Sequence, residues 1–353
     1  MRRKARPGWL ALAAAVVFAA PAEAQQQQPW NNTVLVGAAG VMYGASANLP
    51  GRGMTMVHFM PTFLASFGPD LLFEGELHFT PGADGVETEV EYAQIDYQRF
   101  DHLQLVAGQF LLPFGVFGER LHMGWIDKMP DLPLLYADEA VAEDELMSLP
   151  SDLGVMARYA RSLTPTTDLN MSLYATQGPH MDTPPAPGEP ADVSFGNTFA
   201  DQNSNKLLGA RVGVVVAPKI EVYGSGFLST YDAASTLHYN AANLAAIWRP
   251  LGTQVLGEWT NVWQQFAVGA RTSTLKRSGY FVQAARRFGN FEPVVRWEQL
   301  GEGQAAGTVF RDALHRVGLG LDYWVTASMP IKAAYEWVSG GDDQFIVQWV
   351  FGF

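Results

Sequence analysis

Apolar and polar residues alternate with a period of two along much of the chain beyond residue 30. Across residues 71–80 the odd positions hold leucine, phenylalanine or glycine, whereas Glu74, Glu76 and His78 occupy even positions. The same alternation returns at several later points of the chain. Successive side chains of a strand point to opposite faces, so this pattern predicts an all-β chain whose strands each have one apolar face.

The alternating segments are long. A strand needs about 9 to 11 residues to cross a membrane at the usual tilt, whereas ordinary strands centre on about 5 or 6. We count about 16 such segments, an even number, as bacterial outer-membrane barrels require. The predicted strands are residues 33–44, 54–67, 71–81, 86–98, 102–113, 152–162, 166–177, 206–218, 219–231, 235–247, 251–263, 277–288, 291–302, 313–324, 328–339 and 343–353.

The connections between these strands differ in length according to their order. Those after even-numbered strands are tight, while the two longest, residues 114–151 and 178–205, follow the fifth and seventh strands. A soluble β-sandwich shows the same alternation but has no reason to sort its loops in this way. The sorting favours a transmembrane antiparallel β-barrel with short periplasmic turns, longer external loops and both termini in the periplasm. Pro61 and Pro293 fall inside predicted strands, which predicts a bulge or a shifted strand end at each.

The N-terminal residues have the pattern of a secretory signal peptide. Arg2, Arg3, Lys4 and Arg6 precede an apolar run at residues 9–20, and the small-residue site Ala22-Glu23-Ala24 follows. We therefore expect residues 1–24 to be a signal peptide and residues 25–353 to form one barrel domain in the outer membrane of a Gram-negative cell. The apolar run is too short to span a membrane as a helix.

Composition excludes several functions. The formal net charge is −12, and lysine and arginine are not clustered, which argues against nucleic acid as a partner. The chain has no cysteine, so it has no disulfide framework, thiolate metal site or covalent haem attachment. We expect no cofactor and no metal site, and any redox centre would belong to a partner.

From Gly108 the chain runs Gly-Gln-Phe-Leu-Leu-Pro-Phe-Gly and then enters the longest loop. This resembles the fifth strand and following loop of the phosphate-selective porin O and P family and of general porins related to it. The resemblance implies a 16-stranded barrel, a homotrimer, and a long loop folded into the pore. Phosphate-selective members line the channel with a lysine and arginine ladder, and this chain has only five lysines beyond the signal peptide. Phosphate selectivity is therefore not carried over.

The last predicted strand ends in an aromatic residue. Phe345, Trp349 and Phe353 fall on one face, which would meet lipid, while Ile346 and Gln348 turn inward. A terminal aromatic strand resembles the signal by which the barrel-assembly machinery recognises outer-membrane barrels. The alternative is an ordinary edge strand that ends in phenylalanine by chance.

The loop after the fifth strand holds the candidate constriction residues. These are Glu119, Arg120, Asp127, Lys128 and Asp131, with further acidic residues at 138–145. If the loop folds inward, its carboxylates would favour cations, as acidic rings do in channels. The alternative is that they decorate a solvated external loop or help divalent ions to bridge lipopolysaccharide.

Charged residues of both signs alternate inward within the predicted strands. They could form a transverse field that orients solutes, or simply pair with one another and neutralise a polar interior. These pore-lining candidates are Glu74, Glu76, Arg158, Arg211, Glu258, Arg296, Glu298, Arg316 and Glu336.

The sequence contains no enzyme signature. Its seven histidines form neither His-Glu-x-x-His nor another paired metal spacing, so we predict no catalytic residues. The leading hypothesis is a porin for passive diffusion of small hydrophilic solutes or ions, with a mild cation preference. Two alternatives remain: a barrel sheath that holds a periplasmic partner such as a cytochrome, and a barrel enzyme.

Overall fold

The computed structural model describes residues 32–46, 53–82, 85–121, 124–136, 146–147, 150–181, 183–195, 203–339 and 341–353. The predicted signal peptide, residues 1–24, and the loop acids at 138–145 lie outside the described residues. Within the described part of the chain, no helix has the length and hydropathy needed to cross a membrane.

Sixteen antiparallel strands form the wall of a closed barrel, as the sequence predicts. Most have 9 to 16 residues, as the length argument expects. The wall strands are β1 (Thr33–Ser46), β2 (Gly53–Phe67), β3 (Leu71–Gly82), β4 (Gly85–Phe100), β5 (Leu103–Leu111), β6 (Ser151–Thr164), β7 (Thr167–Thr176), β10 (Leu207–Val216), β11 (Ile220–Leu228), β12 (Tyr239–Trp248), β13 (Thr253–Val268), β14 (Arg271–Arg286), β15 (Phe291–Leu300), β18 (Leu314–Thr326), β19 (Met329–Ser339) and β20 (Gln344–Gly352).

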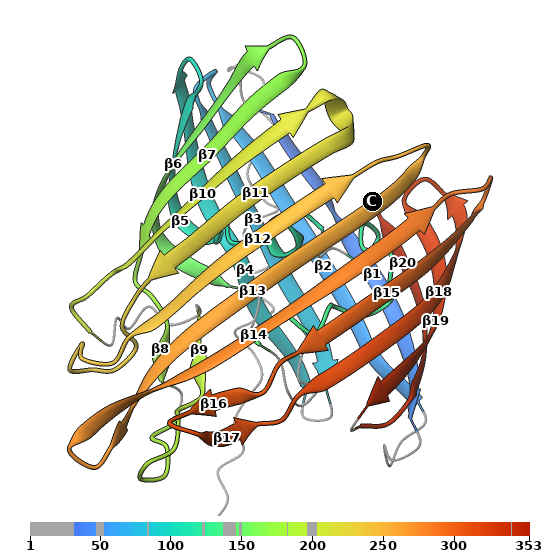
Figure 1. The fold of residues 1–353 in the computed structure, drawn as a ribbon. Helices are drawn as coiled ribbons and strands as arrows, with labels where there is room; N and C mark the ends of the chain where they lie inside the picture. Colours follow the sequence, from blue (N-terminus) through green and yellow to red (C-terminus); the bar gives the residue numbers. More distant parts are fainter. Residues whose placement is uncertain are drawn as a thin grey trace, which may run out of the picture.

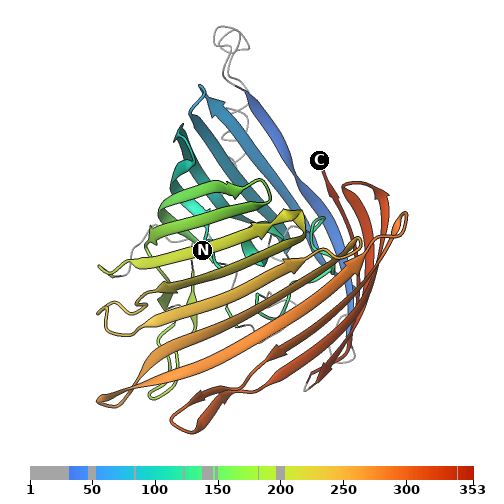
Figure 2. The same cartoon turned by 45° about the horizontal axis from the view of Figure 1, so that its top comes forward.

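The last strand closes the barrel by pairing with the first. The ladder between β1 and β20 runs from Ala38 opposite Gly352 to Ser46 opposite Gln344. Pairing begins at Gly37, which exchanges two backbone hydrogen bonds of 3.0 Å with Phe353. Figures 1 and 2 show the strands strongly tilted around one interior, so that no strand is left as a sheet edge.

Two small hairpins extend the connections on the side of the long loops. They are β8 (His180–Met181) with β9 (Val193–Ser194), and β16 (Gly303–Ala305) with β17 (Thr308–Arg311). The predicted gap at residues 264–276 is instead a continuation of the β13 and β14 hairpin, which turns at Gly269. The alternation is weak there because Phe266 and Leu275 are the only buried apolar residues of this segment, packed against Ala305 and Phe310 of the β16 and β17 hairpin.

The sequence predicts a bulge or a shifted strand end at each of two prolines, and neither proline produces a bulge. Pro61 lies opposite Gly37 in a stretch of the β1 ladder that keeps its register, and the β2 to β3 pairing skips it without a change of register. Pro293 stays in register with Leu321, while the pairing of β15 with β14 ends one residue later, at Val294. A proline lacks only one N–H donor, so each ladder loses bonds on one side and keeps its register on the other.

The outer surface carries a belt of exposed large apolar side chains, including Leu173 at 60% and Trp349 at 53% exposure. On β20, Phe345, Phe351 and Phe353 are also exposed, whereas Ile346 and Gln348 are buried, as the sequence predicts. Inward positions carry polar groups that are mostly buried. An apolar outside with a polar inside is the reverse of a soluble protein and matches a barrel in lipid.

Candidate functional site

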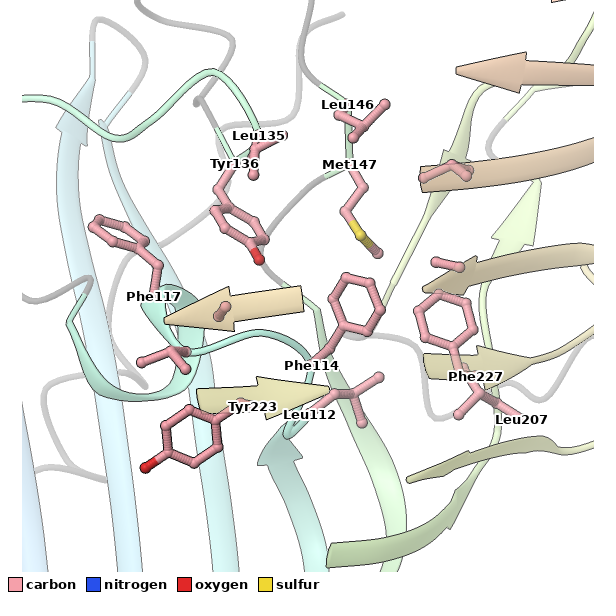
Figure 3. Close-up of a cluster of buried hydrophobic side chains, with 14 of the residues drawn as sticks. Leu112, Phe114, Phe117, Leu135, Tyr136, Leu146, Met147, Leu207, Tyr223 and Phe227 are labelled. Atoms are coloured by element: carbon pink, nitrogen blue, oxygen red, sulfur yellow. The ribbon is translucent and has the colours of Figure 1, made fainter. Parts of the chain in front are cut away.

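The loop between β5 and β6 folds into the barrel. Phe114 and Phe117 are fully buried, with ring centroids 5.2 Å from Phe227 and 5.8 Å from Phe281 on the opposite wall. Figure 3 shows the loop side chains Tyr136 and Met147 among this cluster. The described residues of this loop therefore fold into the barrel, as the porin resemblance implies.

A glycine and a buried carboxylate fix the point where the loop turns inward. Gly115 has a φ of 66°, and a Cβ there would overlap the carboxylate of Glu258 and approach the Tyr136 hydroxyl. Glu258 accepts hydrogen bonds from the backbone N–H groups of Val116 (3.3 Å) and Phe117 (3.2 Å) and from the Tyr136 hydroxyl. The Glu258 side chain thus binds two separate parts of the loop, the backbone at residues 116–117 and the side chain of Tyr136.

The short helix α2 (Phe117–Arg120) presents two charged groups to the wall formed by β6, β10 and β11. Glu119 pairs with Arg158 at 2.9 Å and also with Arg211. Arg120 donates to Glu221 at 2.7 Å and to the Tyr223 hydroxyl at 2.8 Å. The helix therefore joins the charged residues of three strands.

The next part of the loop lies against β15, β18 and β19. Arg296 contacts the carboxylates of Asp131 (2.6 Å) and Glu298 (2.7 Å), and Arg316 contacts the same two at 2.5 and 2.8 Å. Glu336 lies 3.4 Å from Arg296 and 3.2 Å from Arg316. Arg316 also donates to the backbone oxygen of Leu132 at 2.7 Å. These five charged residues, called the clamp cluster below, hold the loop to the wall.

A lysine of β19 and two glycines of β18 hold the preceding turn. The Lys332 ammonium donates to the backbone oxygens of Asp127 (2.8 Å) and Met129 (3.1 Å). Gly318 and Gly320 leave the space that the Met129 side chain fills. Lys128 pairs with Glu292 at 3.2 Å and lies over the ring of Trp324.

The constriction candidates therefore divide into two groups. Arg120 borders open space, whereas Glu119 is 13% exposed and paired with two arginines, and Lys128 is 18% exposed and paired with Glu292. Asp127 and Asp131 are only 4% and 5% exposed, so they do not border an open passage. The expectation for these two is corrected, because the loop packs them against the wall. Burial raises the pKa of Asp127 to about 6. Burial also opposes ionisation of Asp131, but Arg296 and Arg316 outweigh it and hold the pKa of that carboxyl below its usual range.

The nine pore-lining candidates all lie at inward positions, but most do not meet solvent. The loop covers Glu258, Arg296, Glu298, Arg316 and Glu336, none more than 3% exposed, and they form ion pairs or hydrogen bonds instead. Glu76 is also fully buried and accepts from Thr62 at 2.5 Å. Arg158 and Arg211 border open space, and Glu74 is half-buried.

The open space is a cavity of about 900 Å³ toward the end of the barrel where the short turns lie. It extends beside β4 to β7 and β10 to β12, next to α2 of the loop. Its charged lining residues are Arg120, Arg158, Arg211, Glu221 and Arg249, accompanied by Tyr223. Sequence reasoning missed Glu221 and Tyr223, although their positions two apart on β11 could have shown a shared inward face. It also missed Arg249, which follows the last residue of β12, because beyond the end of a strand the alternation no longer predicts to which face a side chain points.

A closed sixteen-stranded barrel with an apolar belt, a polar interior and an inward loop is an outer-membrane β-barrel with the fold of porins. No protein-family model matches the chain, and no curated protein sequence matches it.

Solved structures of outer-membrane proteins share the fold. OmpF of Salmonella typhi, solved in complex with daunomycin, has a TM-score of 0.64 and 14% identity, over 92% of this chain and 98% of that one. A loop-deletion mutant of OmpT from Vibrio cholerae has a TM-score of 0.58 and 10% identity, over 92% and 99%. A mutant of the Rh. blastica porin has a TM-score of 0.54 and 12% identity, over 91% and 100%. At such identities the likeness shows the fold alone, and the resemblance to the porin O and P family stays a resemblance.

Proposed function

We propose that this protein is a porin that allows passive diffusion of small hydrophilic solutes or ions across the outer membrane. The observation that carries the proposal is the polar cavity beside the inward loop. The loop narrows the interior of the barrel without filling it, and about 900 Å³ remains along one wall. In a barrel with this number of strands the side chains of the wall alone do not fill the interior, and the polar lining of the remaining space suits a water-filled passage.

The proposal includes the partners of a porin. The exposed apolar belt supports contact with outer-membrane lipid. The aromatic end of β20 supports insertion by the barrel-assembly machinery, and the porin fold supports a homotrimer. Semi-native electrophoresis and light scattering of detergent-purified protein test the trimer, which a monomeric mass would contradict.

The alternatives gain little from the described residues. A sheath for a periplasmic partner needs a vacant lumen, but loop residues 112–121 and 124–136 pack against the inner faces of β10 to β15 and β18 to β20. For an enzyme, no constellation of a nucleophile with an adjacent base is present at the cavity, whose charged lining is mainly arginine. Neither hypothesis has an observation in its favour.

Ion preference is a separate question. The cation preference expected from the loop depends on open carboxylates. Glu119 and Asp131 are each paired with two arginines, and Asp127 is buried. Among the loop carboxylates, this leaves those of residues 138–145, which lie outside the described part, to supply a cation preference.

Purified protein in a planar lipid bilayer tests the proposed function. We expect stepwise current increases as single barrels insert, and liposomes that contain the protein should swell in isotonic solutions of small uncharged sugars. Heat-denatured protein at the same concentration is the control for detergent artefacts. A folded, inserted barrel that gives no conductance steps and no swelling would overturn the proposal.

A further inference from the structure

Four arginines from four separate elements meet at the cavity. Arg120 comes from α2, Arg158 from β6, Arg211 from β10, and Arg249 follows the end of β12. All four line the same open space near the short turns. Like charges repel, so such a convergence needs compensation by nearby groups.

Two carboxylates supply that compensation. Glu221 bridges Arg120 at 2.7 Å and Arg249 at 2.6 Å. Glu119 bridges Arg158, at 2.9 Å, and Arg211. Each acid therefore neutralises only part of the charge of its two partners, and these six groups keep a formal net charge of about +2.

The exposure of the side chains determines which charge a solute meets. Arg120, Arg249 and Arg158 are 37%, 35% and 29% exposed and Arg211 is 11% exposed, whereas Glu221 and Glu119 are 7% and 13% exposed. Three of the four guanidinium groups are thus the most exposed charges at the cavity. Acidic groups nearby do not reverse this balance, because Asp96 is buried and bonded by Gln94 and Gln104. Neither Asp96 nor Glu74 lines the cavity.

Tyr223 contacts two of the four arginines and one of the two carboxylates. The ring of Tyr223 lies under Arg120 and Arg211, whose guanidinium carbons are 5.7 and 5.6 Å from its centre. Its hydroxyl accepts from Arg120 and donates to Glu221 at 2.8 Å. A guanidinium has five N–H donors. Arg120 engages Glu221 and the Tyr223 hydroxyl through one of its terminal nitrogens, Nη1.

We propose that this arginine array is a binding site for small oxyanions and that it gives the channel a preference for anions. The charge of about +2 matches a dianion, and the paired donors of each guanidinium match the paired oxygens of a carboxylate or a phosphate. The inference deepens the proposed function, on which it rests. It assigns an ion preference opposite to the one that the loop acids suggested.

The test is the reversal potential of single channels in a potassium chloride gradient. We expect the wild-type protein to favour chloride. The double variant Arg120→Gln, Arg249→Gln should move the reversal potential toward the cation side. The control is Arg271→Gln, Lys276→Gln, which makes the same change of charge at exposed residues of the β13 and β14 hairpin, outside the cavity, and should leave the reversal potential unchanged.

Block of the chloride current identifies the ligand chemistry. Sodium succinate and sodium phosphate, added separately, should each reduce the wild-type current. In the double Gln variant the half-blocking concentration should rise roughly tenfold or more, the factor contributed by one hydrogen bond between charged groups. The variant Arg120→Lys, Arg249→Lys keeps the charge but not the paired donors, so it should retain the anion preference and lose part of the block. It also remains informative if the Gln variant fails to fold.

The outcomes separate the two proposals. Channels that conduct but favour cations, or whose preference and block are unchanged by the double Gln variant, would overturn the anion site and leave the porin function intact. Absence of any channel would overturn the porin function and the anion site with it. Block by succinate alone or by phosphate alone supports the site and assigns its ligand class.

Discussion

Replacing Arg296 with methionine tests whether the clamp cluster holds the loop to the barrel wall. Arg296 contacts three carboxylates, those of Asp131, Glu298 and Glu336, at 2.6, 2.7 and 3.4 Å. It also donates to the backbone oxygens of Asp131 (2.9 Å) and Leu132 (3.3 Å). Methionine has a similar length and no charge, so the substitution removes the cation and little of the volume.

The expected magnitude follows from burial. The Arg296 side chain is fully buried, as are the carboxylates it contacts. Without it, Arg316 alone faces three buried acids. Removing one partner of a buried ion pair costs about 3 to 5 kcal/mol, because the remaining charge cannot be solvated. The least costly response is for residues around Asp131 to leave the wall, since the strands are held by their own ladders.

Two measurements follow this response. Urea or guanidinium titration in detergent micelles, followed by tryptophan fluorescence, gives the change in stability. Single-channel recording gives the change in conductance, which should increase as the loop leaves the wall. The matched control is Arg311→Met, because Arg311 is 44% exposed and its partner Asp192 is 71% exposed. An exposed pair of this kind contributes at most about 1 kcal/mol.

A result in which Arg296→Met and Arg311→Met have the same small effect on unfolding and conductance would refute the reasoning. It would mean that the clamp cluster repacks without cost, or that the loop is held by its apolar contacts alone.

Three further predictions concern the loop and the lipid face. Gly115→Ala should weaken the docking of the loop by about 1 to 2 kcal/mol, because alanine is strained in the left-handed backbone conformation, and by more because its Cβ would overlap Glu258. Single-channel currents should then be noisier and larger, and unchanged currents would contradict the prediction. The pKa of Asp127 in the folded chain, about 6, exceeds its value in the unfolded chain. Between about pH 4 and 6 the folded protein therefore binds more protons than the unfolded protein, and the docking of the loop weakens as the pH rises through that window. Open-channel noise should therefore increase from pH 4 to pH 7 in the wild type, and this increase should be reduced in Asp127→Asn; an identical pH profile in both would count against it. Trp349→Lys should lower the free energy of unfolding by up to about 4 kcal/mol in a urea titration in lipid vesicles, because the side chain at this position meets lipid. The control Trp349→Phe should leave the free energy of unfolding nearly unchanged. Equal urea midpoints for the two variants would show that this face is not in the membrane.

The sequence alone predicts the barrel well. Which side of a strand a residue occupies depends only on its place in the alternation, so the sixteen strands and the inward positions of Arg296 and Glu336 follow from local pattern. The tight turns follow from local pattern too, as at Gly289 with its φ of 61°. The pattern fails at residues 264–276, where backbone pairing continues although Phe266 and Leu275 are the only buried apolar side chains of this segment.

Only the tertiary structure decides which inward residues meet water. The loop contacts its anchors far along the chain, since Phe117 and Glu258 are 141 residues apart and Lys332 and Asp127 are 205 apart. No local pattern encodes contacts over such distances, because the path of a long loop is set by the packing surface it meets. That packing buries Asp127 and the clamp cluster and leaves the arginines around Tyr223 open. The alternation along the chain therefore determined the wall of this barrel, and the fold of one loop within it decided where its cavity lies and which charges the cavity presents.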